Sequence, residues 1–218
     1  MRVLCVSDTV DERIDCLESR TYLAGVGAVL GAGDLPGAYL EFLVDLLDVP
    51  VYFVFGNHAE EYVREEGQPP RLPWGCTCVE GRLARHRAWG SPPGAELLLA
   101  GLGGSRRYRP GPHQYSEAEM VLRAVRLVPG LLANRLRAGR YLDVLLTHAP
   151  PWGIQDGPDR PHQGFRALRW LLDRFHPRFL VHGHYDPLDR RVPRQARYGR
   201  TVVVNACGHT LLEVADGL

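Results

Sequence analysis

Six short segments of this chain carry a potential metal ligand at or near the end of an apolar run, and this pattern constrains the fold more than any other feature. In chain order they are Ser7-Asp8, Gly33-Asp34, Gly56-Asn57-His58, Thr147-His148, Gly183-His184 and, less regularly, Asp186. Short apolar runs bounded by turn residues are typical of buried strands. The pattern therefore predicts a sheet whose strands deliver carboxylate, amide and imidazole groups to one edge.

The first part of the chain is expected to alternate between strands and helices. Apolar runs predict strands at residues 2–7, 26–30 and 51–55. Helices are expected around residues 17–23 and over 37–47, where apolar residues recur at helical spacing. This order of elements predicts parallel strands that are joined by crossover helices.

The middle of the chain has a different pattern. It predicts a meander of short antiparallel strands, at residues 76–80, 82–87 and 96–101. A loop rich in Gly and Arg follows at 103–115. Ser116 with Glu119 three residues later is the signature of a capping box, which predicts the start of a long helix that ends near residue 137.

Alternation resumes in the last part of the chain. Strands are expected at residues 142–146, 178–181, 201–205 and 210–214, and a helix over 165–175. No segment is long enough to serve as a linker, so residues 1–218 are expected to form one domain of the α/β class.

Composition excludes several classes of function. The 26 basic and 25 acidic residues nearly cancel, so net charge gives no case for binding nucleic acid or a membrane surface. The amino terminus lacks the pattern of a signal peptide, and no apolar run could cross a bilayer. The five cysteines lack zinc-site spacing, which favours reduced thiols and a cytoplasmic protein.

The candidate ligands share one predicted location. Side chains gather at the carboxyl ends of parallel strands, where the loops converge. Oxygen and imidazole ligands together suit Mn, Fe, Zn or Ni better than Ca. Each residue alone has a simpler interpretation, since Asn57 could cap a helix and His148 could be a packed core histidine. Their occurrence together and in order favours a metal centre.

These motifs resemble those of the calcineurin-like metallophosphoesterases, which are DxH, GD, GNH, a lone His and GHxH. The likeness covers essentially the whole chain and looks closest to a subgroup of bacterial phosphohydrolases, with runs similar to GLGGSRRYRPGPHQY and LLTHAPPWGIQDGPDRPHQGF. It implies a four-layer α-β-β-α sandwich with two mixed sheets, the metallophosphoesterase fold.

The resemblance also implies roles for the candidate residues. Asp34 would bridge two metal ions, with Asp8 on the first ion. The second ion would be completed by Asn57, His148 and His184. His58 would stabilise the developing charge and help the leaving oxygen to depart. The implied activity is metal-dependent phosphohydrolysis, with a phosphodiester as the expected substrate and a metal-bound hydroxide attacking phosphorus in line.

Two residues depart from the family motifs, and both affect the first metal ion. Val10 stands where DxH has its histidine, and Asp186 stands where GHxH has its last one. Asp186 can still ligate, and its oxygen would favour a harder ion such as Mn or Mg. Asp11 or the 103–115 loop could also contribute. We therefore expect one or two ions, with Mn as the preferred metal and Fe, Zn or Ni as alternatives.

The loops supply candidates for binding a small phosphate-ester substrate. Arg107 and His113 lie on the 103–115 loop, and His162 lies on the loop that follows His148. A guanidinium can hold phosphate oxygens. A solvated arginine cluster and a histidine that only fixes its loop are the alternatives. His182 is expected to be packed or to lie behind the metal ligands.

Three other functions remain open from the sequence. The enzyme alternatives are a phosphomonoesterase and a nucleotide pyrophosphohydrolase. The alternative of another class is a non-catalytic, metal-binding scaffold for protein interaction, because this fold is similar to a retromer subunit with altered metal ligands. A large exposed apolar patch would favour the scaffold. The sequence gives no indication of the oligomeric state.

Overall fold

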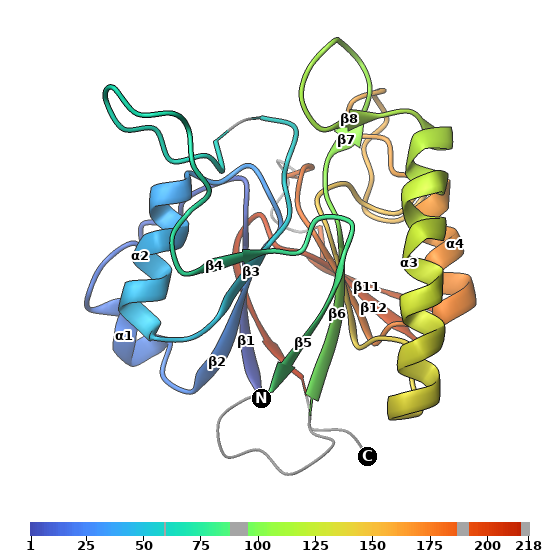
Figure 1. Ribbon diagram of the computed structural model, residues 1–218, viewed down its shortest axis with the longest axis horizontal. Coiled ribbons are helices and arrows are strands. Elements are labelled where there is room, and N and C mark those ends of the chain that lie inside the picture. Colours follow the sequence, from blue (N-terminus) through green and yellow to red (C-terminus); the bar gives the residue numbers. More distant parts are fainter. Residues whose placement is uncertain (59, 88–95, 187–191, 215–218) are drawn as a thin grey trace.

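Two mixed β-sheets pack face to face in the computed structural model of the chain, and helices cover their outer faces (Figure 1). The structure describes residues 1–58, 60–87, 96–186 and 192–214. The layers are helices α1 and α2, the first sheet, the second sheet, and helices α3 and α4. This confirms the predicted α/β class and the four-layer α-β-β-α sandwich.

The first sheet has four parallel strands and one antiparallel edge strand. In spatial order, its strands are β13 (Gly208–Glu213), β1 (Arg2–Ser7), β2 (Val26–Gly31), β3 (Val51–Phe53) and β4 (Cys76–Cys78). Strand β13 runs antiparallel to β1, and the others are parallel to their neighbours. Its outer face is covered by α1 (Ser19–Tyr22) and α2 (Gly37–Leu47).

The second sheet has a parallel centre and an antiparallel strand at each edge. In spatial order, its strands are β11 (Gln195–Tyr198), β12 (Thr201–Asn205), β10 (Phe179–His182), β9 (Val144–Thr147), β6 (Glu96–Leu102) and β5 (Leu83–Arg87). Helices α3 (Glu117–Ala138) and α4 (Arg166–Phe175) cover it. The short strands β7 (Ser105–Arg106) and β8 (Gln114–Tyr115) pair with each other at the loop end.

Three apolar cores lie between the four layers, and strand β1 contributes side chains to two of them. Val3 and Cys5 face the second sheet, while Leu4 and Val6 face the helices. Because side chains alternate along a strand, a strand that is buried on both faces must be apolar throughout. This explains the continuous apolar run at the start of the chain.

Most predicted elements are confirmed, and one part of the predicted arrangement is wrong. The helix over 37–47 and the strand over 201–205 have the predicted bounds. The predicted antiparallel meander does not form, because β4 joins the first sheet beside β3 and β6 pairs in parallel with β9. Only β5 and β6 of that region are antiparallel to each other. The physical reason is that β6 is buried on both faces and so occupies a central position.

Helix α3 begins where the capping box predicts, and it ends at Ala138, close to the predicted end near residue 137. The Ser116 side chain accepts from the backbone N–H of Glu119, and the Glu119 carboxylate accepts from the N–H of Ser116. Gly139, at φ 72°, ends the helix in the left-handed region. Within the described residues, no helix is both long and apolar enough to cross a membrane. The pair β7–β8 and the strand β11 were not predicted, because each is short and polar.

Candidate metal centre

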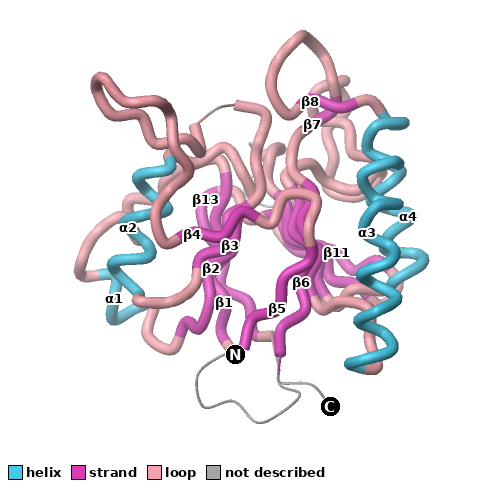
Figure 2. The backbone as a smooth tube through the Cα atoms, in the orientation of Figure 1, coloured by secondary structure: helices cyan, strands magenta, loops and turns pink. Residues whose placement is uncertain are grey.

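The candidate ligands lie in loops that leave the carboxyl ends of strands from both sheets. Asp8 follows β1, Asp34 follows β2, and Asn57 follows β3 in the first sheet. His148 follows β9 and His184 follows β10 in the second sheet. Figure 2 shows these loops at one end of the two sheets, opposite the amino terminus of β1. The sandwich therefore brings together residues that are far apart in the sequence.

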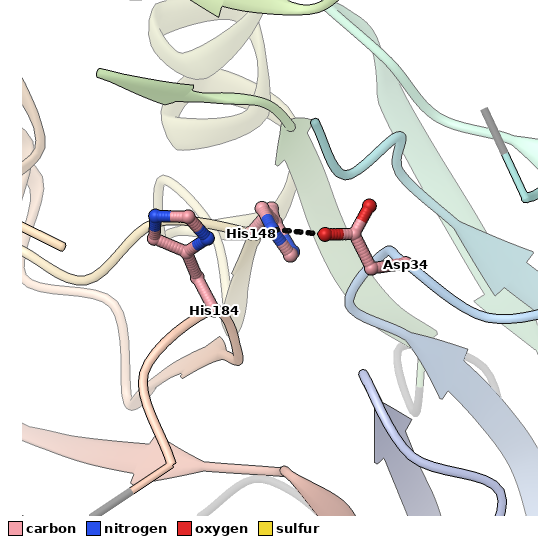
Figure 3. A group of neighbouring side chains, drawn as sticks. All are labelled: Asp34, His148 and His184. Atoms are coloured by element: carbon pink, nitrogen blue, oxygen red, sulfur yellow. Dashed lines mark ion pairs between the residues drawn. The ribbon is translucent and has the colours of Figure 1, made fainter. Parts of the chain in front are cut away.

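Three of these residues converge closely enough to hold one metal ion (Figure 3). Asp34, His148 and His184 each offer a ligand atom, and these atoms all lie within 4.8 Å of one another. The Asp34 Oδ2 atom is 3.2 Å from His148 Nε2. The two imidazole rings are 4.7 Å apart between centroids. Within the described residues, no other three His, Cys, Asp or Glu side chains converge in this way.

Hydrogen bonds on the far side of each ring orient the two histidines. His148 Nδ1 lies 2.7 Å from the carbonyl oxygen of Ala32, which leaves Nε2 directed at Asp34. His184 Nε2 lies 2.8 Å from the carbonyl oxygen of Pro161, and its Nδ1 has no hydrogen-bond partner among the described residues. A carbonyl can only accept, so each ring must place its proton on that side. Metal-ligating histidines are typically held in this manner.

The side-chain amide of Asn57 is a fourth potential metal ligand beside Asp34, His148 and His184. Asn57 is buried, and its Oδ1 atom lies 3.2 Å from His148 Nε2. The side chain thus reaches the same point as the imidazole nitrogen that faces Asp34. A carboxylate, an amide oxygen and two imidazoles form a set of donors that fits a divalent transition metal.

Without a metal ion, Asp34 and His148 form a charged pair at neutral pH. Burial would raise the pKa of Asp34, but the His148 ring and the backbone N–H of His58 outweigh it and lower this pKa to about 2. Burial would lower the pKa of His148, but the charge of Asp34 outweighs it and raises this pKa to about 9. Burial, with the neighbouring His148, lowers the pKa of His184 to about 3. His148 must therefore lose a proton before it binds a metal, because only the neutral ring coordinates.

The backbone at the centre adopts unusual conformations, and two glycines allow the close approach. Asp34 and His184 have φ values of 56° and 67°, in the left-handed region that side chains disfavour. A Cβ atom on Gly56 would overlap the Asp34 carboxylate, and one on Gly183 would overlap the Ser7 hydroxyl. Strained conformations of this kind cluster at functional sites, where the surrounding structure holds them.

Glu61 is a residue of the centre that the sequence analysis missed. It is fully buried, and its Oε1 atom accepts from the backbone N–H groups of Asp34, at 2.8 Å, and of Gly56. Its Oε2 atom has no hydrogen-bond partner among the described residues. One carboxylate thus joins the loop that carries Asp34 to the loop that carries Asn57. The only signal in the sequence was an acidic residue four positions after Asn57, which is common in a loop.

Asp8 lies beside the centre, and one oxygen of its carboxylate is engaged by three protein groups. Its Oδ2 atom accepts from Ser7 Oγ at 2.5 Å and from the backbone N–H of His184 at 2.9 Å. The Cys207 thiol also donates to this oxygen, at 3.3 Å. Asp8 therefore ties the loop after β10 to the end of β1. Cys207 was also missed, since only the tertiary structure brings it to Asp8.

The residues that depart from the family motifs lie together at the edge of a polar cavity. This cavity has a volume of about 790 Å³, and its lining includes Val10, Asp186, Cys207 and His209. Val10 also packs against the core under α2. The Asp186 side chain is 56% exposed and pairs with Arg194 at 3.4 Å. The geometry therefore directs Asp186 toward a guanidinium and does not bring it into the group around Asp34.

Asp11, the other candidate for the first ion, also has protein partners. Its carboxylate accepts from the Arg13 guanidinium at 2.6 Å and pairs with His209 Nδ1 at 2.8 Å. The hydrogen bond from Arg13, together with that from His209, holds the pKa of Asp11 well below its usual range.

His58, the candidate catalytic residue, lies at the rim of the centre. Its backbone N–H donates to Asp34 Oδ1 at 2.8 Å, and its ring Nε2 is 3.8 Å from Asp34 Oδ2. The side chain is 49% exposed, so the ring is open to solvent on one side. An imidazole in this position can reach both the centre and an incoming ligand.

The three candidates for substrate binding are placed differently. His162 lies close to the centre, with its ring 5.1 Å from that of His184 and its Nδ1 atom 2.8 Å from Asp159. The ring of His113 stacks on that of Phe55 at 4.4 Å, and burial lowers its pKa. Arg107 instead directs its guanidinium to both carboxylate oxygens of Glu119, at 2.8 Å each.

His182 lies behind the ligands, buried in strand β10. Its ring nitrogens lie 2.9 Å from the carbonyl oxygen of Gly183 and 3.0 Å from the side chain of Gln155. Burial lowers its pKa to about 4, so the ring is neutral at neutral pH. It therefore joins the loop that carries His184 to the loop that carries Gln155.

Comparison with two solved structures supports the fold. One solved structure is 15% identical to this chain, aligns with a TM-score of 0.61, and is matched over 97% of this chain and 94% of its own. TT1561 of Thermus thermophilus is 16% identical, with a TM-score of 0.55 over 94% of this chain and 88% of its own. A Vps29 variant from Entamoeba histolytica is 15% identical, with a TM-score of 0.43 over 99% and 87%. No protein of curated function matches the chain.

The sequence itself matches a family profile. The profile is that of the calcineurin-like phosphoesterases, and it covers residues 1–185. The matched segment contains all the residues around the candidate centre, from Asp8 to His184. This match confirms the family that the motifs indicated. With most of its length matched and its ligand-bearing loops gathered at one end of the two sheets, the chain belongs to the calcineurin-like phosphoesterase family.

Proposed function

We propose that this protein is a metal-dependent phosphohydrolase that acts on phosphodiesters. The observation that carries the proposal is the convergence of Asp34, His148 and His184 within 4.8 Å in a chain of this family. The hydrogen bonds from both rings to carbonyl oxygens support it, because they direct the free ring nitrogens to one point.

The resident metal would be held by Asp34, Asn57, His148 and His184. One divalent ion at rest fits the structure better than two, because the Oδ2 atom of Asp8 accepts from three protein donors and Asp186 faces Arg194. We propose Mn²⁺ as the native ion, since the donors combine oxygen and imidazole. A bound divalent ion would supply Lewis-acid polarisation of a phosphate oxygen and would lower the pKa of a water molecule.

The protein side chains at the rim would bind the substrate and move protons. His58 is placed to hold a proton on its ring and to give it to the leaving oxygen, because it is half exposed and adjoins Asp34. His162 would contact the substrate on the side of His184. His113, fixed against Phe55, would form the wall on the side of the 103–115 loop. Arg107 would act indirectly, by fixing this loop to Glu119.

We further propose that the protein works in a reducing compartment, the cytoplasm. All five cysteines are free thiols, and Cys5 and Cys207 are buried. Burial raises the pKa of the Cys5 thiol, which keeps it protonated and unreactive.

A non-catalytic scaffold is the second candidate, and the altered first site favours it. Val10 cannot ligate a metal, and Asp186 pairs with Arg194. A scaffold could retain one structural ion at Asp34, His148 and His184. It would have no need for a half-exposed imidazole beside that ion, which is the position of His58.

Hydrolysis of bis-p-nitrophenyl phosphate by metal-stripped protein, with Mn²⁺ titrated back, tests the proposal. Activity should rise with Mn²⁺ and saturate. The His148→Ala variant should lose roughly 100-fold or more, since it removes a ligand and not merely an outer-shell partner. His86→Gln is the matched control, because His86 is also a buried histidine but contacts Tyr52, away from the centre.

The outcomes separate the candidate functions. Cleavage of p-nitrophenyl phosphate in preference to the diester would favour a phosphomonoesterase. Cleavage of nucleotide pyrophosphates alone would favour a pyrophosphohydrolase. Protein that binds Mn²⁺, Fe²⁺, Ni²⁺ or Zn²⁺ but hydrolyses none of these substrates would contradict the enzyme proposal and support the scaffold.

A further inference from the structure

The polar cavity beside the metal centre has the size of a binding site for a small molecule. Its volume is about 790 Å³, and sites for small ligands span roughly 300–1,000 Å³. Its lining comes from the loop after β1, at residues 9–13, and from the start of β13. Asp186 and Arg194, which follow β10 in the chain, complete it. A cavity of this size can hold one ester group of a substrate.

The cavity adjoins the candidate metal centre through Cys207 and Asp8. Cys207 lines the cavity, and its thiol donates to Asp8 Oδ2 at 3.3 Å. The same oxygen accepts from the backbone N–H of His184 at 2.9 Å. Thr9, which follows Asp8 directly, also lines the cavity. A group that is bonded to a phosphate at the centre can therefore extend past Asp8 into the cavity.

The cavity and His58 lie on different sides of Asp34. In the first sheet, strands β13, β1, β2 and β3 are neighbours in that order. The cavity is lined from β13 and from the loop after β1, whereas Asp34 follows β2 and His58 follows β3. In the proposed function, His58 adjoins the leaving oxygen. The ester group that enters the cavity is therefore the one that remains bonded to phosphorus.

The wall of the cavity carries both donors and acceptors, and its charges nearly balance. Arg13 pairs with Asp11 at 2.6 Å, and Arg194 pairs with Asp186 at 3.4 Å. Glu12, the third carboxylate of the lining, is exposed to solvent, where its charge is screened. A paired carboxylate keeps free lone pairs, and a paired guanidinium keeps free N–H groups. The wall can thus accept and donate further hydrogen bonds.

Such a wall favours hydroxyl groups over charged or aromatic ones. A hydroxyl group donates and accepts, so it can bond to a carboxylate and to a guanidinium alike. A second phosphate only accepts and would face three carboxylates, and an ammonium group only donates and would face two guanidiniums. His209 is the only aromatic ring of the lining among the described residues. Its side chain is 6% exposed, so it offers no open face on which a base could stack.

We propose that the cavity binds a hydroxyl-rich ester group of the substrate, a sugar or a polyol, and that the product is its monophosphate. One water molecule is consumed. Its oxygen, with one proton, becomes bonded to phosphorus, the P–O bond to the other ester group breaks, and the leaving oxygen takes the second proton. The inference rests on the proposed function, because that function places the phosphate at the metal centre.

Two p-nitrophenyl phosphodiesters of equal length, the glyceryl and the propyl ester, test the role of the hydroxyl groups. Both release p-nitrophenol, and they differ only in the two hydroxyls of the retained group. With Mn²⁺-loaded protein, we expect kcat/KM to be about tenfold higher for the glyceryl ester, the effect of one or two net hydrogen bonds. The aminopropyl ester, which carries an ammonium group, should be no better than the propyl ester.

Thr9→Tyr tests whether this preference arises in the cavity. The larger side chain fills part of the cavity and should abolish the preference for the glyceryl ester, while kcat/KM for the propyl ester changes by less than about twofold. Thr77→Tyr is the matched control, because Thr77 is also exposed but lies on β4, at the opposite edge of the first sheet. Circular dichroism of both variants checks that the fold is retained.

Calorimetric titration with the two monophosphates separates a failure of this inference from a failure of the proposed function. Glyceryl phosphate should bind Mn²⁺-loaded protein about tenfold more tightly than propyl phosphate, and Thr9→Tyr should remove the difference. If this preference is present but no diester is cleaved, bis-p-nitrophenyl phosphate included, the proposed hydrolysis fails and the binding site is supported without it.

Three results would overturn the proposal. The first is an equal kcat/KM for the glyceryl and propyl esters or, where no diester is cleaved, equal binding of the two monophosphates. The second is a preference for the aminopropyl ester, which would indicate a site for a cation. The third is a preference that survives Thr9→Tyr or that Thr77→Tyr removes equally, which would place the site elsewhere.

Discussion

Glu61 shows how a single side chain can set the geometry of a centre without being a ligand. Its carboxylate accepts from the backbone N–H groups of Asp34 and Gly56 and so fixes two ligand-bearing loops together. We expect Glu61→Ala to weaken Mn²⁺ binding by roughly 10- to 100-fold, the usual effect of losing an outer-shell partner. Glu61→Gln should restore most of the affinity, because its amide oxygen can accept both bonds. Calorimetric titration of Mn²⁺ measures this, and a Gln variant as weak as the Ala variant would contradict it.

The charge state of His148 predicts how metal binding depends on pH. The pKa of His148 is raised to about 9, whereas that of His184 is lowered to about 3. At pH 7 the His148 ring therefore carries a proton that a metal must displace, while the His184 ring is already neutral. Affinity for Mn²⁺ should rise about tenfold per pH unit from pH 7 and level off above about pH 9.

Calorimetry in buffers of different ionisation enthalpy measures the released proton directly. We expect about one proton per ion at pH 7, and none once the pH is well above the pKa of His148. His86→Gln should leave this number unchanged, since His86 lies near Tyr52 and not at the centre. Binding at pH 7 without proton release would show that the His148 ring is neutral before the metal arrives.

At the scale of the element, the amino terminus of α3 is stabilised by its own capping box. Ser116→Ala removes the side-chain oxygen that accepts from Glu119 and should lower the free energy of unfolding by about 1 kcal/mol. Ser116→Asp should retain stability, because aspartate is an equally good cap and adds a negative charge at the helix amino terminus. Urea denaturation of metal-free protein measures both. Equal midpoints for Ser116→Ala and the native chain would show that packing alone determines where α3 begins.

At the scale of the whole molecule, the candidate metal centre joins the two sheets. Asp34 and Asn57 come from loops of the first sheet, and His148 and His184 come from loops of the second. A metal that binds only the folded chain should stabilise it by about 2.7 kcal/mol at a concentration 100 times the dissociation constant. For a domain of this size that corresponds to a rise in Tm of roughly 5–10 °C.

Thermal unfolding with and without Mn²⁺ measures this stabilisation. His148→Ala should abolish the shift in Tm, and Ser116→Ala should keep it, because only the first variant lacks a ligand. A shift of the same size in His148→Ala would place the stabilising ion elsewhere in the molecule.

The sequence by itself determined the features that depend on neighbouring residues. Apolar runs located the strands that become β1, β2 and β12, and helical spacing together with the capping box located α2 and α3. The family could be predicted because Asp34, His148 and His184 each follow a strand with a short, recognisable motif. Burial and turn formation leave such signals locally, since alternation, capping and glycine turns act over a few residues.

Only the tertiary structure decided features that depend on which segments meet. Strand β4 pairs with β3 and not with β5, and the buried position of Glu61 depends on loops that two different strands deliver. Asp186 pairs with Arg194, and no local pattern in the sequence predicts this partner. Apolar residues recur on two sides of α3, and only packing shows which of these two faces is left exposed. Long-range pairing selects among options that are locally equivalent, and for that reason these features cannot be derived from the sequence alone.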